Sequence, residues 1–126
     1  MAARYPVGRT SIDFRPAFTG AGDPDHEGPT RKAYITDVYG LVIHTSVIGN
    51  TAPRWVVSHT RSRYAIGYAD TWQDALYLAD RLGECGPWNR DVEDITADKP
   101  FHTALSAVVR EHGKTSYRRP AASVWG

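Results

Sequence analysis

The sequence predicts a single α+β domain in which an antiparallel sheet of three or four strands is followed by two helices. Between residues 31 and 69, β-branched and aromatic residues occur in short runs separated by turn-forming residues, which is typical of strands. From residue 70 onward, the apolar residues recur with a period of about 3.6, which indicates amphipathic helices. The length of 126 residues fits one domain with one core.

Four runs are expected to form the sheet, and their short connections favour a meander. The expected strands are 32–38, 41–48, 54–59 and 64–69. Tyr39 and Gly40 are expected to form a two-residue turn, because Gly supplies the positive φ that a tight hairpin needs. Residues 1–30 are expected to be irregular, although Ile12 and Phe14 alternate with polar residues as in a further short strand.

The segment 70–113 is expected to hold both helices. Thr71 or Asp70 can cap the first helix, and Gly83 is expected to end it. Its apolar face comprises Trp72, Ala75, Leu76, Ala79 and Leu82. The second helix is expected to start near Asp98 and to end at Gly113, followed by a basic tail at 114–126.

The orientation of the fourth strand leaves a question open. Three small residues are expected on one face, where a helix can approach closely: Ala65, Gly67 and Ala69. Three larger residues then lie on the other face: Tyr64, Ile66 and Tyr68. Together with Trp55, these aromatic rings are either part of the core or an exposed platform.

Composition narrows the class of protein. Cys85 is the only cysteine, which excludes a disulfide within the chain and a four-cysteine zinc site and fits a reducing compartment. The first residues lack a signal-peptide pattern, and no apolar stretch of ~18 residues is present. We therefore expect a cytoplasmic protein without a membrane partner.

The charges are segregated along the chain. Residues 69–99 carry eight acidic and three basic side chains, whereas the segments on either side are each mildly basic. Such a field can steer a charged partner. Arginines outnumber lysines by twelve to three, which suggests a GC-rich genome such as that of an actinobacterium or its phage.

Recognisable catalytic and metal-binding motifs are missing, so we expect no catalytic residue, no cofactor and no metal. The five histidines lack metal-ligand spacing, and the acidic loop 23–28 has Tyr34 where a calcium loop needs a bidentate Glu. One acid–base alternative remains, a metal-free nuclease that uses His44 and His59 with Arg61.

Nucleic-acid binding is the main alternative function and ranks ahead of the nuclease. A basic hairpin and tail supply the candidate residues Arg54, Arg61, Arg63, Tyr64, Arg118 and Arg119. The net charge of +1 and the pI of 7.9 argue against it, since dedicated binding domains usually exceed a pI of about 9.

The run 55–82 supports two resemblances. A Trp-x-Val strand, a basic hairpin and a Thr-led helix resemble the arm-type DNA-binding domains of tyrosine-recombinase integrases, through Trp55, Val57, Thr71, Ala75 and Ala79. Asp74 and Asp80 depart from that pattern by making the helix acidic. The same run is also similar to small uncharacterised proteins of actinobacteria and their phages, a likeness that implies a source and no activity.

The first functional expectation is a small non-catalytic binding protein that acts through a protein partner, either a host protein or a second copy of the chain. The acidic stretch 70–98 can face a basic surface. Trp88 and Trp125 lie in irregular segments and are the expected interface anchors.

Overall fold

The computed structural model describes residues 11–15, 30–45 and 55–112. Its elements, in chain order, are β1 (Ser11–Phe14), β2 (Arg31–Ile35), β3 (Leu41–Thr45), β4 (Trp55–His59), β5 (Ala65–Ala69), α1 (Trp72–Gly83), α2 (Val92–Thr96) and α3 (Lys99–His112). Every adjacent strand pair is antiparallel, and the sheet order follows the chain order. The predicted α+β meander is therefore confirmed, with five strands instead of three or four and with three helices in the described ranges instead of two.

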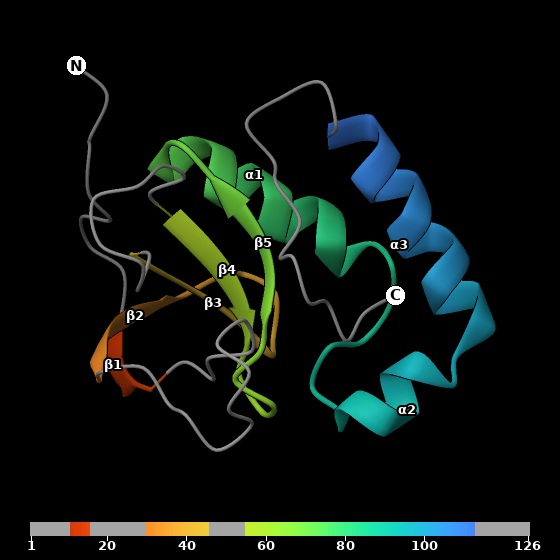
Figure 1. Ribbon diagram of the computed structural model, residues 1–126, viewed down its shortest axis with the longest axis horizontal. Helices are drawn as coiled ribbons and strands as arrows, with labels where there is room; N and C mark the ends of the chain where they lie inside the picture. The colour runs from red at the N-terminus through yellow and green to blue at the C-terminus, as the bar shows by residue number, and fades with distance from the viewer. Residues whose placement is uncertain (1–10, 16–29, 46–54, 113–126) are drawn as a thin grey trace, which may run out of the picture.

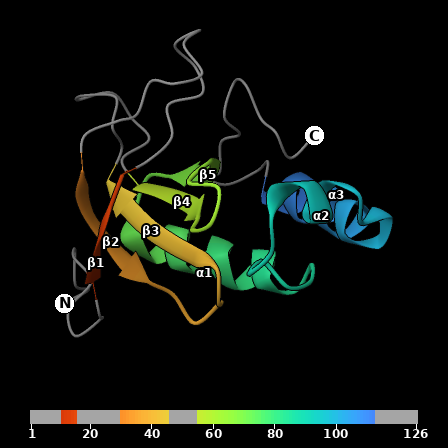
Figure 2. The same cartoon turned by 90° about the horizontal axis from the view of Figure 1, so that it is seen from below.

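Helix α1 packs across one face of the sheet, mainly over β3, β4 and β5 (Figures 1 and 2). Its N-cap is Thr71, whose side chain accepts a hydrogen bond from the Asp74 N–H at 3.1 Å, as the sequence predicts. Gly83 is the last helical residue rather than the stop, and Glu84 is the C-cap. Helix α3 packs against α1 and α2 beyond the edge of the sheet (Figure 1).

The main core lies between the sheet and α1 and extends to α3. Its members on β3, β4, α1 and α3 include Leu41, Ile43, Trp55, Val57, Trp72, Leu78, Leu82, Phe101 and Leu105, and it also contains Ile66, Trp88 and Ile95. Trp55 and Trp72 meet edge to face with their ring centroids 5.4 Å apart. A smaller cluster on the opposite face comprises Phe14, Ala33 and Val42.

A β-bulge between β4 and β5 changes the predicted faces of the last strand. Val57 pairs with Gly67 and Ser58 with Ala65, so Ile66 is an extra residue on β5. Ile66 therefore joins the main core instead of sharing a face with Tyr68. Gly67 and Ala69 pair with the core residues Val57 and Trp55, and these small residues allow α1 to approach, as expected.

The loop between β2 and β3 is longer than the predicted two-residue turn. It runs from Thr36 to Gly40, and Gly40 has the expected positive φ of 102°. The buried Thr36 side chain accepts from the Val38 N–H at 3.1 Å and donates to the Leu41 carbonyl at 3.0 Å. These hydrogen bonds within the loop fix its conformation, and the loop forms one wall of the candidate site.

Candidate functional site

The turn between β4 and β5 carries three residues of the predicted nucleic-acid surface. Arg61 is exposed and forms an ion pair with Asp91 at 2.8 Å, so its charge is already balanced by an acidic side chain. Arg63 adopts a left-handed conformation with φ of 66°, and its N–H bonds the His59 carbonyl to close the turn. Tyr64 is half-buried against the main core. The remaining candidates lie outside the described residues: Arg54, Arg118 and Arg119.

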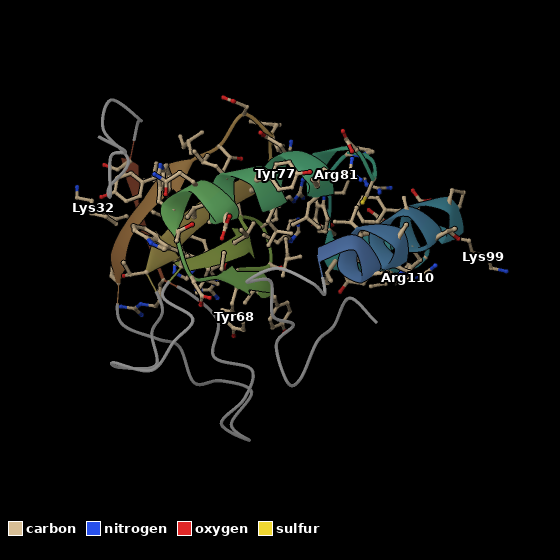
Figure 3. The ribbon with its side chains drawn as sticks, turned by 90° about the horizontal axis from the view of Figure 1, so that it is seen from above. Lys32, Tyr68, Tyr77, Arg81, Lys99 and Arg110 are labelled. Atoms are coloured by element: carbon tan, nitrogen blue, oxygen red, sulfur yellow. The ribbon has the colours of Figure 1, made fainter. Side chains whose placement is uncertain are left out.

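The aromatic residues near this turn do not form a shared exposed platform. Trp55 is buried in the main core beneath α1. Tyr68 is half-buried on the opposite side of the sheet from α1 (Figure 3), and its burial raises the pKa of its hydroxyl. The open question about these rings is thus answered mainly in favour of the core.

The two histidines of the acid–base alternative lie on opposite faces of the sheet, and both are buried. His44 Nε2 is 2.8 Å from Ser58 Oγ, and its Nδ1 is 2.8 Å from the Thr45 carbonyl. His59 shares its face with Trp55 and Val57, which pack beneath α1. The structure therefore does not bring His44, His59 and Arg61 into one pocket.

His59 connects the end of β4 to the segment that follows α1. Its Nε2 donates to the Trp88 carbonyl at 2.7 Å, and its Nδ1 accepts from the Ser62 hydroxyl at 2.7 Å. Burial is the main cause that lowers the pKa of His59, and the Trp88 and Arg90 carbonyls oppose this shift. His59 is therefore uncharged at neutral pH, and its hydrogen bond to Trp88 joins the end of β4 to the segment after α1.

Cys85 lacks the environment of a nucleophile. Burial raises the pKa of its thiol to about 11. A nucleophilic cysteine needs the opposite shift, because the thiolate is the reactive form.

Trp88 is fully buried, which corrects the prediction that it is an exposed interface anchor. Its indole N–H donates to the Leu82 carbonyl at 2.7 Å, and its ring meets Phe101 edge to face at 4.8 Å. The irregular segment folds back because these partners satisfy both the polar and the apolar parts of the indole. Trp125 lies outside the described residues.

A groove of about 470 Å³ lies between the β2–β3 loop and the C-terminal end of α1. Its apolar walls come from Val38, Gly83, Gly86, Pro87 and Trp88. Its charged lining residues are Asp37, Asp80 and Glu84, and none of the described lining residues is a Lys or Arg. We call these lining residues, together with Tyr39 and Asn89, the acidic groove.

Close backbone contacts hold the two walls of the acidic groove together. A Cβ on Gly40 would lie 2.8 Å from the Asn89 nitrogen and from the Trp88 carbonyl carbon. A Cβ on Gly83 would lie 2.6 Å from a Val38 methyl group. Because only glycine fits at both positions, the loop and the helix end can approach closely enough to form the groove.

Two large aromatic residues are exposed at and near the acidic groove. Tyr39 is 80 % exposed at the tip of the β2–β3 loop and lines the groove. Tyr77 is 52 % exposed and lies one turn before Asp80 on α1; Figure 3 shows it on the outer side of that helix, next to Arg81. Exposed tyrosines beside a concave surface are typical of binding sites.

Sequence reasoning missed the acidic groove because its two walls, at residues 37–39 and 80–89, lie far apart in the chain. The sequence shows an acid and an aromatic at Asp37 and Tyr39, and acids near the end of the first helix at Asp80 and Glu84, but it does not show that these segments meet. Only the tertiary contacts of Gly40 and Gly83 bring these segments together.

The described ranges 11–15, 30–45 and 55–112 hold neither a cluster of metal ligands nor a helix that could span a membrane. No three His, Cys, Asp or Glu side chains in these ranges gather in a way that could hold a metal ion. Among the described helices, none has the length and apolar character needed to cross a bilayer. Comparison with known proteins finds no family model, curated protein or solved structure that matches this chain.

Proposed function

We propose that this chain is a small non-catalytic binding protein that acts through a protein partner. The acidic groove is the observation that carries this proposal, because it combines a concave apolar surface with charged groups at its margin and an exposed aromatic residue.

The side chains that a catalytic site would need are all in environments that suit a structural role, which supports a non-catalytic function. His44 and His59 are buried, are engaged in hydrogen bonds and lie on opposite faces. Burial raises the pKa of the Cys85 thiol. Each of these side chains therefore has a structural explanation.

A binding groove gains affinity when it is rigid before the partner arrives, since less conformational entropy is lost on binding. The acidic groove is held on one side by the Thr36 hydrogen bonds and on the other by the bond from His59 to the Trp88 carbonyl. These hydrogen bonds hold both walls in place before a partner binds, so the groove is a preformed site and not a surface that must rearrange.

Selection of peptides from a random display library tests the proposal. We expect peptides that bind the wild-type protein and lose binding to a Tyr39→Ala variant, because Tyr39 is exposed in the groove and supports no core residue. An Asp94→Asn variant controls for a surface change outside the groove, since Asp94 is exposed on α2 and does not line the groove. A library that yields no groove-dependent peptide would contradict the proposal.

A parallel measurement with duplex and single-stranded nucleic acid tests the alternative. Anisotropy titrations at about 50 and 200 mM salt reveal phosphate contacts through their steep salt dependence. Salt-sensitive binding that an Arg61→Ala, Arg63→Ala variant weakens would favour the nucleic-acid function instead.

A further inference from the structure

We infer that the acidic groove binds a basic segment of its partner protein and receives an Arg or Lys side chain from that segment. This inference rests on the proposed function and adds the chemistry of the partner. It follows from three properties of the acidic groove, namely its charge, its wall chemistry and its exposed tyrosine.

The charge of the acidic groove is of one sign. Asp37, Asp80 and Glu84 line it from two different elements, the β2–β3 loop and α1. Arg81 neutralises part of this charge through its ion pair with Glu84. The described lining itself holds three carboxylates and no Lys or Arg, a composition that complements a cationic partner.

The C-terminal end of α1 adds to the same field. The helix ends at Gly83, and both Gly83 and Glu84 line the acidic groove. The last turn of a helix carries a partial negative charge, and that charge favours a cation nearby. The carboxylates and the helix end therefore act together on a bound Arg or Lys.

The walls suit the remainder of a long basic side chain. The methylene groups of Lys and Arg pack on apolar surface while the charged end stays near carboxylates and water. Val38 and Pro87, which are half-buried and exposed, respectively, supply such surface in the acidic groove. Tyr39 supplies an exposed aromatic ring of the kind that stacks with a guanidinium or ammonium group.

The charge distribution of the whole chain supports the same orientation. Within residues 69–99, acidic side chains outnumber basic ones by eight to three, and this stretch supplies α1 and the connector that form most of the groove. The electrostatic field of this stretch would steer a basic segment of the partner toward the acidic groove.

Fluorescence anisotropy with defined peptides tests the inference. The probe is a labelled Gly/Ser peptide with two adjacent arginines, compared with the same peptide carrying citrulline, which keeps the shape of Arg without its charge. We expect the arginine peptide to bind roughly tenfold more tightly than the citrulline peptide at about 50 mM salt, since it gains both ion pairs and a cation–π contact.

Variants locate the binding. Asp80→Asn should weaken the arginine peptide by roughly two- to fivefold, the usual range for an exposed ion pair. Tyr39→Ala should weaken it by a similar factor, whereas Asp94→Asn should leave it within twofold, because Asp94 lies outside the acidic groove. Amide shifts in nuclear magnetic resonance spectra should concentrate at Val38, Tyr39 and Gly83.

Three results would overturn the inference: equal affinity for the arginine and citrulline peptides, equal loss in Asp80→Asn and Asp94→Asn, or no binding of the arginine peptide. The display selection separates this failure from failure of the proposed function. Groove-dependent peptides without Arg or Lys would leave the protein-binding function standing and would reject a basic partner.

Discussion

Replacing Trp88 by alanine tests whether this residue holds the fold together or serves as an interface anchor. Its side chain is fully buried, packs edge to face on Phe101 and donates to the Leu82 carbonyl. Truncation of a buried Trp to Ala costs roughly 3–5 kcal/mol of unfolding free energy. Because domains of this size are stable by about 5–15 kcal/mol, such a loss should be large and easily measured.

A second variant separates packing from hydrogen bonding. Trp88→Phe keeps an aromatic ring against Phe101 but removes the indole N–H. The Leu82 carbonyl keeps a second donor, the Cys85 N–H at 3.0 Å, so it is not left unsatisfied. We therefore expect Trp88→Phe to cost about 1–2 kcal/mol, well below the cost of the alanine variant.

The assay is urea denaturation followed by far-ultraviolet circular dichroism, which does not depend on the fluorescence of the removed indole. Tyr39→Ala is the exposed aromatic control and should stay within about 0.5 kcal/mol of the wild type. If Trp88→Ala unfolds at the wild-type urea concentration and instead loses peptide binding, the structural role is refuted and Trp88 is an interface residue.

Three further predictions concern single residues. Because burial lowers the pKa of His59 below 6.5, the unfolded chain binds a proton at this residue more readily than the folded chain does. The free energy of unfolding should therefore fall as the pH drops from 6.5 toward that lowered pKa. A His59→Gln variant should lack this part of the pH dependence of the urea midpoint, and identical pH profiles for the variant and the wild type would contradict the prediction. Gly40→Ala should cost about 2 kcal/mol in the same assay, because it places a Cβ at positive φ and 2.8 Å from the Asn89 nitrogen; a neutral effect would show that the loop is free to move. Burial raises the pKa of the Cys85 thiol from the ordinary 9.0 to about 11, so Cys85 should carry roughly a hundredfold less thiolate at neutral pH than a free cysteine. It should react with iodoacetamide correspondingly slowly, and a rate equal to that of free cysteine would contradict its burial.

Much of the fold follows from local patterns in the sequence. The change of period near residue 70 locates the start of α1, and the Thr71 cap forms because its side chain can accept the Asp74 N–H. The four main strands begin close to their expected positions, although β2 ends earlier than predicted, at Ile35. Helix α2 was missed because five residues are too few to show a helical period.

The remaining differences depend on contacts between distant parts of the chain. A bulge between β4 and β5 directs the Ile66 side chain toward the main core, and no local sequence pattern at Ile66 signals this bulge. Burial of Trp88 depends on Leu82 and Phe101, which belong to two different helices. Residues in an irregular segment can therefore be assigned to core or surface only when the tertiary partners are known.

The acidic residues of the stretch 69–99 belong to consecutive elements, and two of them, Asp80 and Glu84, line the acidic groove together with Asp37. The connector after α1 is held in place by His59, which donates to the Trp88 carbonyl, and by Arg90, which donates to the Pro87 carbonyl and to Asp98. Two of the nearby basic side chains are balanced there, Arg61 by Asp91 and Arg90 by Asp98. None of the described residues that line the acidic groove is a Lys or Arg, so its carboxylates favour a positively charged group there.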